Sequence, residues 1–197
     1  MHRKLSNDRA LGIVAAARGE FAARGYAGAR VDVIARAAKV NKQLLFYYYH
    51  SKRGLYQAVW REAATELQRA LADLGSPPGL PLQRLQAVLD RLFDYLADHQ
   101  DLVALLSRPA ARGEAGPFGA VVSRLVPIIA EGQGLGYVRD DLDPHLLAAQ
   151  ALVLQLGFLT LEPVVAASAP PLGADEPALR ARWKRALGEL ILSACRE

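Results

Sequence analysis

The chain has 197 residues, of which 52% are hydrophobic, 22% charged and 7% aromatic, a composition typical of globular proteins and unlike that of disordered ones. Its single cysteine, Cys195, excludes an internal disulfide and is compatible with a reducing compartment. The net charge of +4 is unevenly distributed, because residues 1–56 hold eleven Lys or Arg against three acids and the remainder holds thirteen against seventeen. A basic segment followed by a slightly acidic one is typical of nucleic-acid-binding proteins.

The sequence predicts neither secretion nor membrane insertion. The N-terminal residues are polar and basic and are not followed by the apolar run of a signal peptide. The most apolar stretch, Leu146–Leu161, is interrupted by Gln150, Gln155 and Thr160, which makes it too short and too polar for a typical membrane span. We therefore expect a soluble, cytoplasmic protein with no membrane partner.

Helical periodicity recurs along the chain and strand alternation is almost absent, so we predict an all-α fold of about nine helices. In the first helix, Ile13, Ala17 and Phe21 recur every four residues, and Gly25 is placed to end it in a left-handed conformation. The first four helices are expected at about residues 7–24, 31–38, 42–49 and 51–73.

A break of three residues, Lys39–Asn41, separates the second expected helix from the third. Asn41 and Ser51 have the short polar side chains that cap helices, and they precede the third and fourth. Two short helices joined by such a turn form a helix-turn-helix, whose second helix can enter the major groove of DNA. We therefore predict a helix-turn-helix DNA-binding domain over residues 1–50.

The stretch Gly75–Pro81 holds two glycines and three prolines and ends the fourth helix. Pro127 is expected to kink the seventh helix, because proline removes a backbone donor and clashes with the preceding turn. We predict that residues 51–197 form a domain for ligand binding and dimerisation. Its later helices are expected at about residues 82–96, 100–107, 117–131, 144–167 and 176–195.

The third helix is expected to have distinct inner and outer faces. Leu45 and Tyr49 lie four residues apart and should both face inward, one above the other. Five side chains are then left to face outward, among them a lysine, an amide and two tyrosines: Lys42, Gln43, Leu44, Tyr47 and Tyr48.

The chemistry of this outer face suits DNA. Lys42 and Gln43 lie in the first turn, and lysine suits the acceptors of guanine whereas glutamine suits adenine. Tyr47, Tyr48 and Lys52 carry hydroxyl and ammonium donors of the kind that bind phosphates. The alternative is an ordinary surface helix whose aromatic side chains pack against their neighbours.

Five short segments stand out between residues 11 and 60 by their residue types and spacing. They are Ile13–Ala17, Phe21–Tyr26, Ile34–Ala35, Ala38–Asn41 and Leu45–Lys52. Together they resemble the N-terminal motif of the TetR family of bacterial transcriptional regulators. The resemblance implies a dimer that binds a palindromic operator in double-stranded DNA. It also implies base contacts from Lys42, Gln43, Leu44 and Phe46, and phosphate contacts from Arg30, Tyr47, Tyr48 and Lys52.

Three departures from the family pattern affect base preference. Lys39 stands where the family usually has a glycine, so keeping a left-handed turn there costs roughly 1 kcal/mol. Phe46 replaces the usual tyrosine and leaves an apolar surface that can touch a thymine methyl. Arg30 follows Ala29 in place of a Ser or Thr cap, which exchanges a neutral phosphate donor for a charged one.

The last two helices are predicted to form the dimer interface. The eighth is apolar almost all round and must be covered on several sides, whereas the ninth has one clean apolar stripe. Pairing with their symmetry mates would bury both, as the resemblance implies; a purely intramolecular core is the alternative. The expected interface residues are Phe158, Leu161, Trp183, Leu187, Leu190 and Ile191.

An effector site is predicted among the fourth to eighth helices, for a small apolar or amphipathic molecule. Gln155 is an amide within an apolar run, and its partner is a ligand, a neighbouring backbone group or its dimer mate. The aromatic candidates can equally be core residues. The expected ligand-binding residues are Trp60, Phe93, His99, Arg108, Phe118, Gln155 and Phe158.

Nothing in the sequence indicates an enzyme, a metal site or a bound cofactor. The four histidines are isolated, and no glycine-rich phosphate loop is present. Asp90, Asp94 and Asp98 recur every four residues, which is typical of a solvated acidic helix face. We therefore expect a repressor released from its operator by an effector. The alternatives are an activator, an effector-free regulator, or a small-molecule-binding helical bundle with an incidental basic head.

Overall fold

The computed structural model describes residues 2–73, 75, 77–107, 118–168 and 176–196, with side chains described from residue 8 onward and not for Phe118 or Glu176. Within these ranges the chain forms helices and no strand, so the all-α prediction is confirmed. The helices are α1 (His2–Gly28), α2 (Val31–Ala37), α3 (Lys42–Tyr49), α4 (Lys52–Asp73), α5 (Pro81–Asp98), α6 (Gln100–Leu106), α7 (Phe118–Gly134), α8 (Pro144–Ser168) and α9 (Glu176–Arg196).

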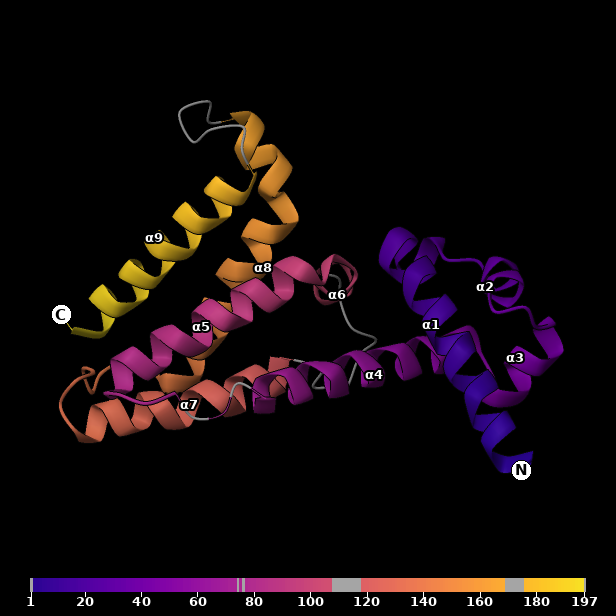
Figure 1. The fold of residues 1–197 in the computed structure, drawn as a ribbon, viewed down its shortest axis with the longest axis horizontal. Coiled ribbons are helices and arrows are strands. Elements are labelled where there is room, and N and C mark those ends of the chain that lie inside the picture. Colours follow the sequence, from indigo (N-terminus) through magenta and orange to yellow (C-terminus); the bar gives the residue numbers. More distant parts are fainter. Residues whose placement is uncertain (1, 74, 76, 108–117, 169–175, 197) are drawn as a thin grey trace.

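The helices are arranged in two groups along an elongated molecule (Figure 1). We call α1–α3 the head and α5–α9 the body, and the long helix α4 runs from one to the other. In the body, α7 packs against α8 and α5, and α5 packs against α9. The head meets the body where α1 packs against α6, and α1 also packs against the connecting helix α4. The C-terminus lies at the end of the molecule away from the head.

Local signals in the sequence explain the ends of the head helices. Gly25 interrupts α1 with a φ of 66°, as predicted, and a short helical stretch continues to Gly28. The Asn41 side chain accepts a hydrogen bond of 2.7 Å from the backbone N–H of Leu44, which caps α3. The Oγ of Ser51 accepts a 3.0 Å hydrogen bond from the N–H of Gly54 and caps α4. Both predicted caps are confirmed.

Gly54 allows the sharp change of direction between α3 and α4. A Cβ atom at this position would lie 2.2 Å from the carbonyl oxygen of Tyr49, a distance that no real side chain tolerates. The two helices therefore cross closely only because residue 54 has no side chain. This fixes α3 against α4, the helix that enters the body.

The core runs continuously from the head through α4 into the body. Apolar residues on α4, such as Leu55, Val59 and Leu67, are fully buried along its length, which suits a helix that both groups of helices cover. In the body, α7 continues through Pro127.

Candidate DNA interface

The turn between α2 and α3 has the geometry of a helix-turn-helix. The backbone N–H of Val40 donates to the carbonyl of Ala35 over 2.9 Å, and the N–H of Lys39 donates to Arg36 over 3.0 Å. Lys39 has a φ of 54°, so the chain keeps the left-handed turn without glycine, at a cost of roughly 1 kcal/mol. His50, after α3, also has a positive φ, of 61°, which the sequence did not indicate.

The inner face of α3 is anchored to the head as predicted. Leu45 is fully buried in the core, and α3 packs against α2 and α4. The hydroxyl of Tyr49 donates a 2.8 Å hydrogen bond to the carbonyl of Ala10 in α1. An apolar knob and a hydrogen bond one turn apart hold α3 in a fixed rotation about its own axis.

The outer face of α3 is open to solvent. Lys42, Gln43 and Phe46 are exposed, and Tyr47 is 74% exposed. Leu44 and Tyr48 are half-buried and flank these residues. The ring of Tyr48 packs edge-on against Tyr47, with centroids 5.5 Å apart. Large side chains held outward by a buried inner face are suited to contact a groove.

Basic residues of α2 and α3 share this surface. Asp32 lies between Arg30 and Arg36, with N···O distances of 3.5 and 3.8 Å. Slight desolvation would raise the pKa of Asp32, but a backbone hydrogen bond and the charges of Arg30, Lys42 and Arg36 together lower it. Lys42, in the first turn of α3, thus adds its positive charge to those of Arg30 and Arg36 around Asp32.

Lys52 has contacts that the sequence did not predict. Its Nζ donates a 3.2 Å hydrogen bond to the carbonyl of Ala27 and lies 5.0 Å from the centre of the Tyr26 ring, a cation–π geometry. These contacts hold the ammonium group at the N-terminus of α4. The backbone N–H groups at a helix N-terminus also attract anions, so both kinds of group favour an anion at this place. Arg53, which the sequence analysis did not select, is exposed beside it.

Three of the aromatic residues predicted to line an effector site, Trp60, Phe93 and Phe158, are packed in the core. Phe158 stacks between Phe93 and Trp183, with ring centroids 6.0 and 4.4 Å away. Trp60 packs edge-on against Tyr56, with centroids 6.2 Å apart. Hydrophobic type and helical spacing are shared by core and pocket residues, so the sequence could not separate these two roles.

The polar candidates of that site have partners of their own. The Nε2 of Gln155 donates a 2.9 Å hydrogen bond to the carbonyl of Leu89, whereas its Oε1 is buried and has no partner among the described residues. His99 places its Nδ1 2.7 Å from the carbonyl of Tyr95. Arg108 and the side chain of Phe118 lie outside the described residues.

Two cavities beside the described helices of the body are open to its surface. One of about 590 Å³ lies at the end away from the head, between Leu80, Tyr137 and Arg139. Another of about 360 Å³ lies between α4 and α7, beside Gln68 and Arg124. Trp60, Phe93, His99, Gln155 and Phe158, the predicted ligand residues whose side chains the structure describes, line neither of these two cavities.

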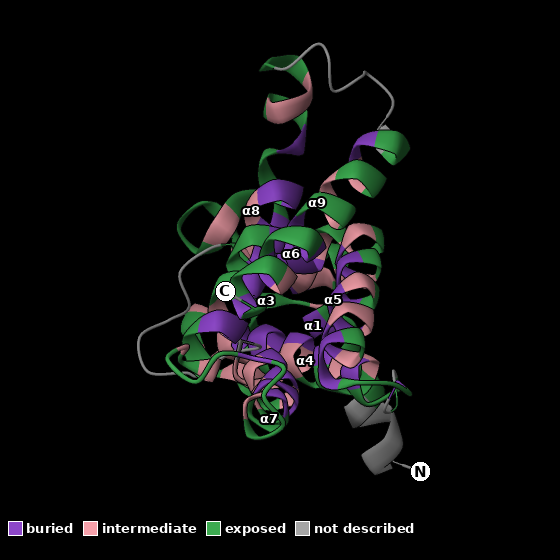
Figure 2. Ribbon diagram, turned by 90° about the vertical axis from the view of Figure 1, so that its left-hand side faces the viewer, coloured by how far each residue is buried: buried purple, intermediate pink, exposed green. Residues whose placement is uncertain are grey.

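The outer side of α8 and α9 is an uncovered apolar face. Figure 2 shows exposed residues in green along the outer turns of both helices. A groove of about 440 Å³ lies between them, and Leu190 on its edge is 60% exposed. We call this surface the apolar α8–α9 face; its exposed residues are Leu146, Val153, Leu154, Leu161, Val164 and Leu190.

The residues predicted for the dimer interface differ in their exposure on the single chain. Leu161 and Leu190 are exposed, but Phe158, Leu187 and Ile191 are buried within the protomer. Trp183, whose ring stacks on Phe158, is half-buried. The reason is that α8 and α9 first cover α5 and α7, so one side of each apolar helix belongs to the core and only the opposite side remains for a partner.

Charged and polar groups mark the inner side of α8. Arg180 of α9 pairs with Glu162 through N···O distances of 2.7 and 2.8 Å, and Glu162 is buried.

By length and composition α8 is apolar enough to cross a membrane, but its buried Gln155 and Glu162 face protein. In the described part of the chain, no three His, Cys, Asp or Glu side chains lie close enough to hold a metal ion.

The sequence of the head matches known regulators. The family described as bacterial regulatory proteins, tetR family, matches residues 13–59. The chain is 39% identical over 94 residues to an HTH-type transcriptional repressor of Streptomyces coelicolor, across 48% of this chain and 45% of that relative. It therefore spans about half the length of that relative. It is 30% identical over 141 residues to the HTH-type transcriptional repressor DhaR of Mycobacterium sp. strain GP1, across 65% of this chain and 69% of DhaR.

Solved structures extend the similarity to the body. A transcriptional regulator from Streptomyces coelicolor has a TM-score of 0.71 at 28% identity, over 91% of this chain and 96% of that chain. FadR from Bacillus subtilis, solved with stearoyl-CoA, has a TM-score of 0.71 at 19% identity, over 93% and 98%; this shows a shared fold. The predicted resemblance is confirmed, and the chain belongs to the TetR family of bacterial regulatory proteins.

Proposed function

We propose that this protein is a dimeric, cytoplasmic repressor that binds a palindromic operator by placing α3 in the major groove. The outer face of α3 is the observation that carries the proposal. Lys42 and Gln43 are exposed in its first turn while Leu45 on the opposite side is fully buried. A helix held by its inner face presents the same side chains to every DNA site, as base reading requires.

Repression and dimerisation are supported by separate observations. Both relatives described above are transcriptional repressors by name. The apolar α8–α9 face exposes six apolar side chains around a groove, and exposed apolar patches of this kind usually mark protein interfaces. A second copy of the chain, placed by a two-fold axis, would cover this face and present two copies of α3 to successive major grooves.

We also propose that a small apolar or amphipathic effector releases the protein from its operator. The support is the fold shared with FadR, whose structure contains stearoyl-CoA. Effector-free repression is a second candidate, favoured by the tight stack of Phe93, Phe158 and Trp183 where a pocket was predicted. A ligand that lowers operator affinity must bind more weakly to the DNA-bound protein by the same factor. The rise in melting temperature that a small apolar compound causes, measured with and without operator DNA, therefore separates the two candidates.

Paired substitutions in the head test the proposed DNA contacts. Lys52→Ala should weaken binding to all duplexes alike and flatten the slope of log K against log salt by about one unit, because one phosphate contact is lost. Gln43→Ala should change which sequences bind, because its amide reads a base edge. Both are measured by fluorescence anisotropy over a range of salt concentrations.

Lys184→Ala is the matched control for the loss of one charge. Lys184 lies in the body, where its Nζ pairs with Asp94 at 2.7 Å, so its removal should leave the salt slope at the wild-type value. A changed sequence preference in Lys52→Ala, with an unchanged salt slope, would show that Lys52 is not a phosphate contact.

A further inference from the structure

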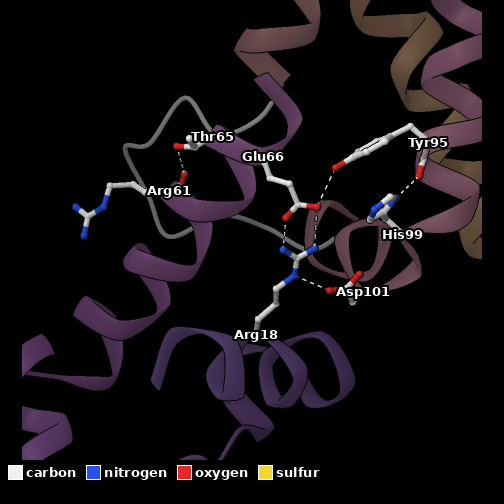
Figure 3. Close-up of polar contacts among 7 residues, drawn as sticks. All are labelled: Arg18, Arg61, Thr65, Glu66, Tyr95, His99 and Asp101. Atoms are coloured by element: carbon white, nitrogen blue, oxygen red, sulfur yellow. Dashed lines mark hydrogen bonds and ion pairs between the residues drawn. The ribbon is translucent and has the colours of Figure 1, made fainter. Parts of the chain in front are cut away.

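Arg18 lies at the junction between head and body and contacts two carboxylates on different helices (Figure 3). From α1, its Nε donates a 2.5 Å hydrogen bond to Asp101 in the first turn of α6. Its two terminal nitrogens contact both carboxylate oxygens of Glu66 on α4. The side chain is only 16% exposed. One guanidinium group therefore joins three helices, and its planar shape fixes their relative directions.

A second layer of contacts holds the Glu66 carboxylate in place. The hydroxyl of Tyr95, on α5, donates a 2.8 Å hydrogen bond to Glu66 Oε1. The Tyr95 ring stacks on His99, with centroids 4.1 Å apart, and the backbone carbonyl of Tyr95 lies 2.7 Å from His99 Nδ1. Figure 3 shows the Tyr95 hydroxyl reaching Glu66 from the body side while Arg18 approaches from the head.

The charges in this cluster are complementary at neutral pH. Burial would raise the pKa of Glu66, but hydrogen bonds from Arg18 and Tyr95 and the Arg18 charge outweigh it and lower that pKa. Burial would likewise lower the pKa of Arg18, but its bonds to Glu66 and Asp101 raise it. Glu66 and Arg18 are therefore both ionised, and the contact is a true ion pair.

We propose that this cluster, the Arg18 clasp, fixes the orientation of the head on the body and thereby sets the spacing of operator half-sites that the dimer accepts. The inference rests on the proposed DNA-binding function. Arg18 lies in α1 and is not on the outer face of α3, so it acts on DNA through the position of the head. Half-sites lie one helical turn apart, roughly 34–36 Å, and only a head held in one direction can reject other spacings.

The test compares Arg18→Met with Arg84→Met. Arg84 pairs with Glu131 inside the body at 2.7 Å, with exposed fractions of 22% and 44%, close to the 16% and 44% of Arg18 and Asp101. Duplexes carry the selected operator, the same operator with one base pair added or removed at its centre, or one half-site. The wild type should prefer the selected spacing, and Arg18→Met should lower this preference about fivefold or more.

Single half-site binding should change less than about twofold in Arg18→Met, because α3 itself is intact. Arg84→Met should keep the wild-type preference. In an Asp101→Asn background, Arg18→Met should reduce the preference by less than it does alone, because the two residues act through one contact. Arg18→Lys keeps the charge and loses the planar contact, so its preference for the selected spacing should lie between those of the wild type and Arg18→Met.

A spectroscopic measurement tests the clasp without DNA. A spin label on Ala37→Cys, exposed at the end of α2, reports the distance between the two heads of a dimer. Arg18→Met should broaden this distance distribution, and Arg84→Met should leave it unchanged. If Arg18→Met left the distribution of head-to-head distances unchanged, or weakened half-site and full-site binding equally, the proposed role of the Arg18 clasp would be wrong. A wild type that binds no duplex would overturn the proposed function, and the role of the clasp in spacing with it.

Discussion

Leu190→Asp is expected to convert the protein from a dimer into a folded monomer. Leu190 is 60% exposed on the apolar α8–α9 face, so a carboxylate there is tolerated by the protomer but would be buried without a partner in the dimer. An unpaired buried charge costs several kcal/mol, enough to dissociate the dimer at micromolar concentration. Light scattering should give twice the chain mass of 21.3 kDa for wild type and the single mass for the variant.

Leu135→Asp is the matched control, because Leu135 is 59% exposed but follows α7 and lies outside the apolar α8–α9 face. It should remain a dimer. Leu187 would be an unsuitable choice, because it is buried in the protomer and an aspartate there would destabilise the protomer itself. If Leu190→Asp and wild type had the same mass, the proposed interface would be wrong.

Phe158→Ala is expected to destabilise the fold by about 3–5 kcal/mol, the usual cost of truncating a buried phenylalanine. Phe158 is 3% exposed and stacks on Phe93 and Trp183, so its removal leaves a cavity between α5, α8 and α9. Urea unfolding followed by circular dichroism measures the loss, at one fixed protein concentration because dimer stability depends on it.

Phe46→Ala provides the comparison with an exposed phenylalanine. Phe46 lies on the outer face of α3, and surface substitutions usually change stability by less than about 0.5 kcal/mol. This variant should therefore lose DNA affinity while keeping its unfolding midpoint. A Phe158→Ala protein as stable as wild type would show instead that Phe158 lines a space, as the sequence suggested.

The head was predictable because its signals are local. Asn41 caps α3 through a residue three positions away, and Gly25 and Lys39 adopt positive φ values within their own turns. Leu45 and Tyr49 follow from helical spacing. Such features depend on a few neighbouring residues, and the sequence displays them directly.

The rest depends on contacts between distant parts of the chain. Arg18 meets Glu66 and Asp101, which lie 48 and 83 residues away, and nothing in the spacing indicates either partner. Likewise, α8 is apolar on every side, so the sequence alone could not tell that Phe158 faces inward and Leu161 outward. Which side of an apolar helix meets the core is decided by the helices packed against it.

Selection of bound sequences from a random duplex library tests most directly whether α3 reads an operator as part of a symmetric dimer. The wild-type protein should enrich an inverted repeat whose two halves are centred about one helical turn apart, roughly 10 base pairs. Gln43→Ala should enrich a repeat with the same spacing and an altered base in each half. Enrichment of no sequence, or of a single asymmetric site that Gln43→Ala leaves unchanged, would contradict this account.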